Sequence, residues 1–269
     1  MPELPEVEAI RRRLETEVVG SEIVSTCVHR ASTTHPQRPA PVESHTAAHR
    51  IEAIRRRGKN LLLELSGGIV LHIHLRMSGN LYVLPGDGHR LATARVIFEL
   101  SDGRALIFDD TRALGKVHVY KTRDIPHLLR GIGLEPLSSE FTVEALANAA
   151  RGARQPIKIF LLDQRHIAGL GNIYAAEALF RAGIDPRKPA GKLRRSRLKA
   201  LHAAIVAILA DAVQSAHIAY ASPGRFREAE RFPLLVYNRA GEACGICGRA
   251  IRRILQGGRS TYFCPGCQR

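Results

Sequence analysis

The chain has 269 residues, of which 45% are hydrophobic, so it can bury the cores of two modest domains or one large one. No uninterrupted apolar run approaches the roughly 18 residues of a membrane span, and the acidic, proline-bearing N-terminus is unlike a secretory signal, so we expect a cytoplasmic protein. The formal net charge is +15, and residues 151–269 carry 21 Lys and Arg against 7 Asp and Glu. This basic half predicts a polyanionic partner, nucleic acid first, although an arginine-rich composition alone would give the same total.

Residues 3–19 carry the pattern of an amphipathic α-helix. Apolar side chains recur at spacings of three and four, which places them on one face, while residues 11–13, all arginine, take much of the other. Pro5 lies in the first turn, where a missing N–H costs little, and Gly20 is suited to end the helix. The apolar face consists of Val7, Ile10, Leu14 and Val18.

Eight short runs with β-type patterns follow, several of them separated by turn signals such as Asp102-Gly103. Residues 31–47 hold three prolines and many polar groups, which predicts a surface loop. Cys27, beside a valine-rich run, is predicted to be a buried small hydrophobe. This half therefore predicts a helix packed on an antiparallel β-sandwich. The runs are Glu22–His29, Arg50–Arg57, Asn60–Leu65, Ile69–Leu75, Leu81–Leu84, Ala94–Leu100, Ala105–Phe108 and Lys116–Tyr120.

The second half of the chain has helical spacings, and we expect the boundary between the halves near residues 125–140. A Gly-Leu-Gly-Asn turn at 169–172 joins two predicted helices, and Asn172 is placed to cap the second of them. Gly169 and Gly171 would let a phosphate approach the helix N-terminus, although a plain helical hairpin would show the same features. The predicted helices are Val143–Ala150, Pro156–Leu162, Asn172–Ala182 and Arg194–Ser215.

Four of the five cysteines lie in the last 26 residues, in two Cys-x-x-Cys pairs separated by sixteen residues. Two such pairs supply four thiolates for a tetrahedral Zn²⁺ site, and a site saturated with thiolates is structural and not catalytic. The residues between the pairs suit a β-hairpin with residues 256–259 at its tip, where Arg259 would bind a phosphate or remain a solvated surface side chain. The predicted zinc ligands are Cys244, Cys247, Cys264 and Cys267.

The N-terminus has the residues of a nucleophilic centre. Initiator methionine is normally removed before proline, which would leave the secondary amine of Pro2 at the positive end of the helix dipole, where the unprotonated form is favoured. Attack on a sugar C1′ would expel the base and give an iminium that permits β-elimination, with Glu3 shuttling protons. By itself, a Met-Pro-Glu start also fits an ordinary beginning of a helix.

Seven short stretches, in order along nearly the whole chain, form a jointly specific set. They are Met1-Pro-Glu-Leu-Pro-Glu-Val-Glu8, Arg57-Gly-Lys59, His74-Leu-Arg-Met-Ser-Gly79, Asp110-Thr-Arg-Ala-Leu-Gly115, Leu161-Leu-Asp-Gln164, Ala168-Gly-Leu-Gly-Asn-Ile-Tyr174 and Val236-Tyr-Asn-Arg239. With them the chain resembles the formamidopyrimidine-DNA glycosylases (Fpg, or MutM) of the wider Fpg/Nei family. The resemblance implies an α+β multidomain fold: a helix-flanked antiparallel β-sandwich in residues 1–130, a helix–two-turn–helix domain in 131–235 and a zinc finger in 236–269. DNA would bind between the two halves, with the damaged nucleotide flipped out.

The same resemblance implies roles for individual residues. Pro2 matches the family's nucleophile and Glu3 its general acid. Lys59 matches a lysine that binds phosphate and assists catalysis. Asn172 and Arg259 match clamps on the phosphates that flank the lesion.

Further DNA contacts follow from the resemblance. Lys158 is expected to contact the DNA backbone, and Met77, Arg112 and Leu114 match the residues that fill the space left by the flipped base. Without the resemblance, Met77 and Leu114 would be interpreted as core residues. Leu114 stands where the family usually has an aromatic wedge, which puts the substrate preference in doubt. Residues 216–235 are expected to contain the loop that caps the flipped base.

The resulting hypothesis is a bifunctional DNA glycosylase and abasic-site lyase of base excision repair, which removes formamidopyrimidines and 8-oxoguanine. Its partners would be one structural zinc ion and double-stranded DNA that contains oxidised bases or abasic sites, and nothing in the sequence requires more than a monomer. One alternative is the same chemistry with a preference for oxidised pyrimidines. Another is a non-catalytic protein that binds damaged DNA.

Overall fold

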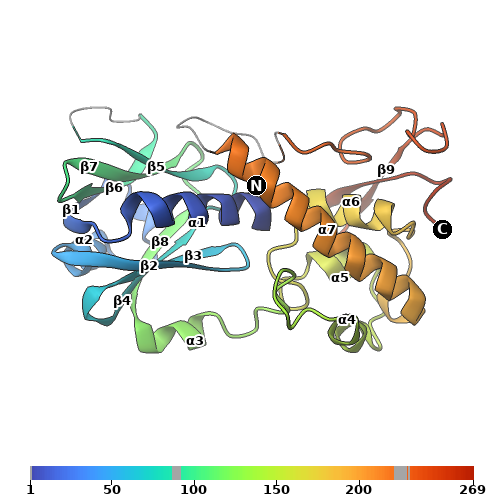
Figure 1. The fold of residues 1–269 in the computed structure, drawn as a ribbon, viewed down its shortest axis with the longest axis horizontal. Helices are drawn as coiled ribbons and strands as arrows, with labels where there is room; N and C mark the ends of the chain where they lie inside the picture. Colours follow the sequence, from blue (N-terminus) through green and yellow to red (C-terminus); the bar gives the residue numbers. More distant parts are fainter. Residues whose placement is uncertain (1, 87–91, 221–228, 230) are drawn as a thin grey trace. The chain divides into compact units, whose positions relative to one another are not determined.

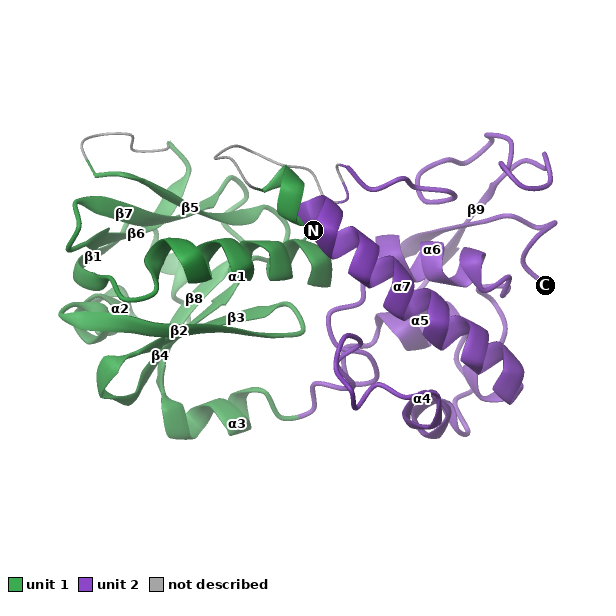
Figure 2. Ribbon diagram, viewed as in Figure 1, with its two compact units in different colours: residues 1–130, 217–228 green, residues 131–216, 229–269 purple. Residues whose placement is uncertain are grey.

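The protein, described by a computed structural model over residues 2–86, 92–220, 229 and 231–269, forms two compact units (Figure 1 and Figure 2). The first comprises residues 1–130 and 217–228, and the second 131–216 and 229–269. Met1 and part of the expected base-capping segment lie outside the described residues. The zinc-finger segment belongs to the second unit, and its standing as a separate domain stays a prediction.

The described residues of the first unit form one eight-stranded antiparallel sheet in the order β5-β7-β6-β1-β2-β3-β4-β8. The junction of β1 with β2 holds only two residue pairs, Glu22 with Arg50 and Ile23 with His49. This short junction lets the two halves of the sheet separate into the predicted sandwich layers (Figure 1). The strands are β1 (Glu22–Val28), β2 (His49–Arg57), β3 (Asn60–Leu65), β4 (Ile69–His74), β5 (Gly79–Pro85), β6 (Ala94–Leu100), β7 (Arg104–Asp110) and β8 (Lys116–Lys121).

Helix α1 (Leu4–Val18) contacts β2, β3 and β5. The residues of its predicted apolar face are fully buried, which stabilises the packing by roughly 1.5–3 kcal/mol per side chain. The prediction that residues 11–13 lie on the outer face is wrong for Arg13, which is buried. Its guanidinium donates hydrogen bonds to the backbone oxygens of Tyr220 and Leu81, so it joins α1 to β5 and to the residue that follows helix α7 (Arg195–Ala219).

Two further predictions for the first unit are wrong. The expected loop at residues 31–47 contains helix α2 (Pro39–Thr46), because Pro39 lies at the first helical position and Val42 and Thr46 are buried against the sheet. Cys27 is exposed, because its side chain points away from the core side of β1. The described residues also include the short helix α3 (Ile125–Leu128) and 3-10 segments at Ala31–Thr33, Ser66–Gly68, Thr122–Asp124 and Ala190–Lys192.

The second unit is helical and ends in a β-hairpin, as predicted. Thr142 caps the first of its helices by accepting the backbone N–H of Ala145 at 3.0 Å. An apolar cluster, which includes Phe180, Val236 and Tyr262, packs the hairpin against a helix. The elements are α4 (Val143–Ala150), α5 (Ile157–Leu162), α6 (Asn172–Arg181), α7 (Arg195–Ala219), β9 (Arg252–Gln256) and β10 (Arg259–Phe263).

Helix α7 is long and apolar enough to cross a membrane by length and composition, although the sequence has no uninterrupted apolar run of that length. It is 25 residues long, and 44% of its most apolar window is buried inside the protein. Leu201, Ile205 and Leu209 are fully or almost fully shielded from solvent. A core helix of a helical domain has these properties, and we interpret α7 as one.

Candidate active site and metal centre

The beginning of α1 places two of the predicted catalytic residues next to each other. Pro2 and Glu3 are both buried, and Glu3 is the N-cap of the helix. A capping box fixes this end: the Glu3 carboxylate accepts the backbone N–H of Glu6, and the Glu6 carboxylate accepts that of Glu3 at 2.8 Å. The positive end of the helix dipole lies here, which favours the unprotonated form of the amine that removal of Met1 would leave.

Lys59 lies in the two-residue turn between β2 and β3, and it is buried. Gly58 precedes it with a φ of +58°, in the left-handed region that glycine adopts at least cost. Arg57 pairs with Asn60 across the turn, and Asn60 Nδ2 donates to the Arg57 oxygen at 3.0 Å. Asn60 in turn pairs with His74 on β4, so the Lys59 turn lies beside the end of that strand.

His74 orients the turn that carries Met77. Its Nδ1 accepts the backbone N–H of Arg76 at 3.1 Å, and Arg76 has a left-handed φ of +55°. Burial, and then the positive charges nearby, lower the pKa of His74 to about 3. Because the ring is neutral at physiological pH, Nδ1 keeps its role as acceptor and the turn keeps its shape.

Asp110 holds the turn that carries Arg112 and Leu114. Its buried carboxylate accepts the backbone N–H of Gly115 at 2.7 Å and that of Arg112 at 3.2 Å. The Ser78 hydroxyl also donates to Asp110 and accepts the N–H of Arg112 at 3.1 Å. One carboxylate and one hydroxyl therefore join this turn to the neighbouring turn that contains Ser78.

The predicted base-replacing residues are exposed on these two turns. Met77 is 40% exposed and Leu114 is 43% exposed, and Arg112 is exposed as well. The interpretation of Met77 and Leu114 as core residues, made without the resemblance, is therefore wrong. Apolar side chains held outside the core on braced turns are suited to enter a gap in a base stack.

The Gly-Leu-Gly-Asn turn of the second unit is braced by Gln164. Its amide oxygen accepts the N–H of Gly169 at 2.8 Å, and its amide nitrogen donates to the oxygen of Leu170 at 2.9 Å. The prediction that Asn172 caps the following helix is wrong: Gly171 is the N-cap, and Asn172 is the first residue of α6. Asn172 Nδ2 instead donates to the backbone oxygen of Ser260 at 3.1 Å. The amide carries a second N–H that can donate to a phosphate.

Lys158 differs from its expected place at the DNA backbone. Its side chain is 0% exposed, and its ammonium donates to the Ser260 oxygen at 2.9 Å and to the Thr261 hydroxyl at 3.0 Å. It therefore holds β10 against α5 from inside the unit. Arg259, the residue before Ser260, is exposed at the hairpin tip, so Lys158 holds the strand that presents Arg259.

We predict that Lys158→Met weakens DNA binding without changing the number of phosphates that the protein neutralises. The slope of log K against log salt should then stay at the wild-type value, whereas Arg259→Ala should reduce its magnitude by about one. Fluorescence anisotropy with a duplex over a range of salt concentrations measures both slopes. A slope of smaller magnitude for Lys158→Met would instead support the expected direct contact between Lys158 and a phosphate.

Glu177 is a structural residue that the sequence patterns did not single out. It is fully buried on α6, and its carboxylate accepts three backbone N–H groups, those of Leu235, Val236 and Tyr237, at 2.8–3.0 Å. This contact fixes the segment that leads into the zinc hairpin. The available signal was the single acidic residue of a mostly apolar helix, since a buried carboxylate is expected to be paired.

The four predicted zinc ligands converge in the second unit, with their sulfur atoms all within 4.8 Å of one another. A Zn–S bond of about 2.3 Å places tetrahedral sulfurs about 3.8 Å apart. The Sγ atoms of Cys244 and Cys267 are 3.8 Å apart and those of Cys247 and Cys264 are 3.4 Å apart, too far for disulfides. The donor set fits one structural zinc ion and offers no open position for catalysis.

The zinc hairpin has the predicted tip. Gln256 ends β9, Arg259 begins β10, and the two residues pair across a Gly257-Gly258 turn. Both glycines have positive φ, at 54° and 73°, as a type I′ hairpin turn requires.

The buried His72 and the half-buried His74 of β4 predict a stability that falls in acid. Burial is the main cause that lowers the pKa of His72 to about 4 and that of His74 to about 3, against about 6.5 in an unfolded chain. Below pH 6.5 the unfolded chain therefore binds protons that the folded chain does not, and stability is lost as the pH falls towards 4. The expected loss is roughly 2 kcal/mol per histidine at pH 5. Urea unfolding at pH 7.5 and pH 5 measures it.

The non-titrating variant His72→Gln provides the control, since it should lose less stability between these two pH values than the wild type. An equal loss in both proteins would assign the acid sensitivity to other groups.

Comparisons with known proteins cover both units. Residues 1–117 match the model of the formamidopyrimidine-DNA glycosylase N-terminal domain, 132–222 that of the formamidopyrimidine-DNA glycosylase H2TH domain, and 241–269 that of a zinc finger found in FPG and IleRS. A formamidopyrimidine-DNA glycosylase of Chloroflexus aggregans is 42% identical over 277 residues, which cover 100% of this chain and 98% of the relative.

Solved structures of Lactococcus lactis Fpg are similar over almost the whole chain. A variant in complex with DNA that contains Fapy-dG, and a complex with DNA that contains an abasic site, each have a TM-score of 0.91 and 33% identity. Each comparison covers 99% of both chains.

A β-sandwich that begins with a proline-headed helix, followed by a helix–two-turn–helix segment and a four-cysteine zinc hairpin, defines a class of DNA glycosylases of base excision repair. The family models and the full-length relatives agree with this class. The chain belongs to the formamidopyrimidine-DNA glycosylase family.

Proposed function

We propose that this protein removes oxidised purines, formamidopyrimidines and 8-oxoguanine, from double-stranded DNA and then cleaves the strand, with Pro2 as nucleophile. The observation that carries the proposal is the buried start of α1, where Pro2 adjoins Glu3 at the positive end of a 15-residue helix. Membership of the family supports the activity. The protein would work as a monomer in the cytoplasm, on chromosomal DNA.

The chemistry begins at the Pro2 nitrogen once Met1 has been removed. The amine attacks C1′ of the damaged nucleotide, the bond from C1′ to the base breaks, and the base leaves with the bonding electrons and the proton that the amine loses. Glu3, as general acid, protonates the sugar ring oxygen, which opens the ring and gives an iminium between Pro2 and C1′.

The iminium then acts as an electron sink for strand cleavage. Loss of a proton from C2′ expels the 3′ phosphate in a β-elimination, and a second elimination at C4′ expels the 5′ phosphate. Water finally hydrolyses the iminium and frees the amine. Lys59, buried in its turn beside β4, is the proposed phosphate ligand that assists these steps.

The proposed DNA contacts come from both units. In the first, Met77 and Leu114 would fill the gap in the stack while Arg112 hydrogen-bonds the orphaned partner base, which would favour cytosine there. In the second, Asn172 and Arg259 would bind the phosphates that flank the lesion. The support for this pair is their common neighbour Ser260, which follows Arg259 and accepts a hydrogen bond from Asn172.

The test is borohydride trapping on a panel of duplexes with 8-oxoguanine, formamidopyrimidine, thymine glycol, 5-hydroxyuracil or an abasic site. We expect a covalent adduct and strand cleavage with the purine lesions opposite cytosine and with the abasic site. Faster trapping on the pyrimidine lesions would favour the alternative substrate class, which the aliphatic wedge Leu114 suggests. Tight binding with no adduct on any duplex would support the other alternative, a non-catalytic protein that binds damaged DNA.

A further inference from the structure

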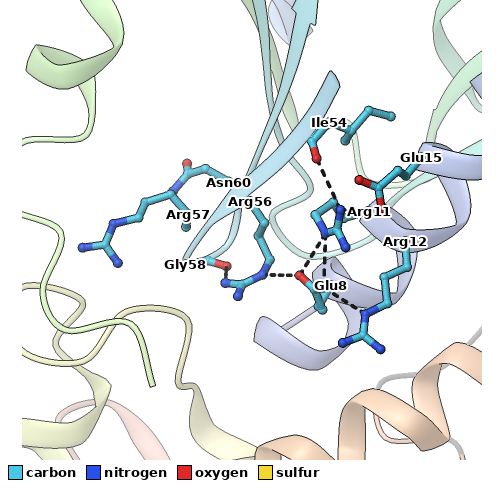
Figure 3. Close-up of polar contacts among 9 residues, drawn as sticks. All are labelled: Glu8, Arg11, Arg12, Glu15, Ile54, Arg56, Arg57, Gly58 and Asn60. Atoms are coloured by element: carbon cyan, nitrogen blue, oxygen red, sulfur yellow. Dashed lines mark hydrogen bonds and ion pairs between the residues drawn. The ribbon is translucent and has the colours of Figure 1, made fainter. Parts of the chain in front are cut away.

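Glu8, on α1, lies in an ion-pair cluster that the proposed chemistry does not use (Figure 3). Its carboxylate accepts hydrogen bonds from the Nε atoms of three arginines: Arg56 at 2.8 Å, Arg12 at 3.0 Å and Arg11 at 3.1 Å. The Glu8 and Arg56 side chains are only 11% and 8% exposed. The cluster therefore joins the helix that carries Pro2 to β2 through a buried ion pair.

The same Arg56 guanidinium reaches the turn that holds Lys59. While its Nε donates to Glu8, its Nη1 donates to the backbone oxygen of Gly58 at 3.0 Å (Figure 3). Gly58 is the residue before Lys59 in the two-residue turn. The planar guanidinium of Arg56 thus links helix α1 to the backbone carbonyl of Gly58 in this turn.

The charge state of Glu8 suits this link. Burial raises its pKa, but the hydrogen bond and charge of Arg56, with those of Arg11 and Arg12, outweigh burial and lower it. The carboxylate is therefore ionised at neutral pH, and both partners of the buried pair are charged.

Stability alone does not explain a buried ion pair at this place. Desolvation of two charges offsets much of their attraction, so a well-packed apolar pair would stabilise the helix as well or better. The fully buried apolar face of α1 already holds the helix on the sheet. What the pair adds is direction, because the planar Arg56 guanidinium donates to Glu8 and to Gly58 at once and so fixes both the distance and the angle between α1 and the turn.

We propose that Glu8 and Arg56 are positioning residues that hold Lys59 at a fixed place relative to Pro2 and Glu3. The inference rests on the proposed function, since it assigns the two residues to the placement of that site's lysine. A displacement of about 1 Å at a catalytic group can cost up to a hundredfold in rate.

The experiment compares Glu8→Gln with Glu15→Gln under single-turnover conditions. Glu15 pairs with Arg11 at 2.9 Å on the same helix but is 52% exposed, so it is the matched control. We expect Glu8→Gln to slow formation of the trapped adduct by about tenfold to a hundredfold. Its trapped fraction at completion, and its affinity for a tetrahydrofuran-containing duplex, should stay at the wild-type values. Glu15→Gln should keep the wild-type rate.

Repeating the comparison of Glu8→Gln with Glu15→Gln in a Lys59→Ala background separates positioning of Lys59 from a general effect on the fold. If Glu8 acts through Lys59, then Glu8→Gln has no further effect once the lysine is absent. An equal slowing in both backgrounds overturns the proposal. Arg56→Lys, which keeps the charge but lacks the fork that reaches Gly58, should slow the reaction as Glu8→Gln does, and it replaces that variant if the latter does not fold.

A spectroscopic measurement keeps the test independent of activity. After reductive methylation with ¹³C, the Lys59 resonance is the one missing in Lys59→Ala, and it should shift in Glu8→Gln but not in Glu15→Gln. If the wild type forms no adduct, the proposed function fails. The shift of the Lys59 resonance in Glu8→Gln then shows by itself whether Glu8 positions Lys59. An unmoved resonance together with a wild-type rate overturns the inference while leaving the proposed function in place.

Discussion

Replacing Pro2 by glycine is expected to slow base excision by on the order of a hundredfold or more, while binding to an abasic-site analogue persists. Glycine would offer a primary amine on a flexible residue, whereas the proline ring holds a secondary amine in one orientation at the start of α1. A secondary amine also gives an iminium that is cationic without a further proton, so the electron sink for elimination is permanent. The loss should therefore fall on the chemical steps and not on recognition.

The measurement is the single-turnover rate of borohydride trapping on an 8-oxoguanine:C duplex, with anisotropy on a tetrahydrofuran duplex for binding. Mass spectrometry should show that Met1 has been removed from both proteins. Pro5→Ala is the matched control, because Pro5 lies in the first turn of the same helix and carries no free amine. Equal losses of excision and binding in Pro2→Gly would mean that Pro2 serves the fold of the N-terminus instead.

Local patterns were sufficient for most of the fold. Every predicted β-run corresponds to a strand, because alternation and turn signals are set by neighbouring residues. Helix α2 was missed because its proline-rich segment is a poor helix by composition, and burial of Val42 and Thr46 against the sheet outweighs that preference. The exposure of Cys27 likewise depends on which side of β1 faces the core, which one strand cannot reveal.

The candidate site was predictable where its residues form short motifs and unpredictable where contacts are distant in sequence. Asp110 lies inside a matched motif, yet its bond to Ser78 joins two turns that are 32 residues apart. Lys158 was placed at the DNA by the resemblance, and only the fold reveals its partners more than 100 residues away, Ser260 and Thr261. The roles of the individual site residues stay predictions until variants are measured.

Removal of zinc is the second change with a large expected effect: DNA affinity should fall by on the order of tenfold or more while the β-sandwich stays folded. Two of the cysteines, Cys244 and Cys264, belong to the apolar cluster that packs the hairpin against α6. Without the metal, nothing joins the four cysteines of this short segment, and Cys244 and Cys264 are no longer held in the apolar cluster. The hairpin would then release Arg259 from its fixed place.

The measurement is duplex affinity before and after chelation, with zinc loss verified by metal analysis and the β-sandwich followed by its own unfolding transition. Arg259→Ala separates the two ways in which affinity could fall. If zinc acts by holding Arg259 at the tip, then chelation should weaken the Arg259→Ala protein less than the wild type, because that phosphate contact is already gone. An equal loss in both proteins would show that the metal supports other DNA contacts. Unchanged affinity after verified zinc loss would mean that the hydrogen bonds of Lys158 and Asn172 to Ser260 hold the hairpin without the metal.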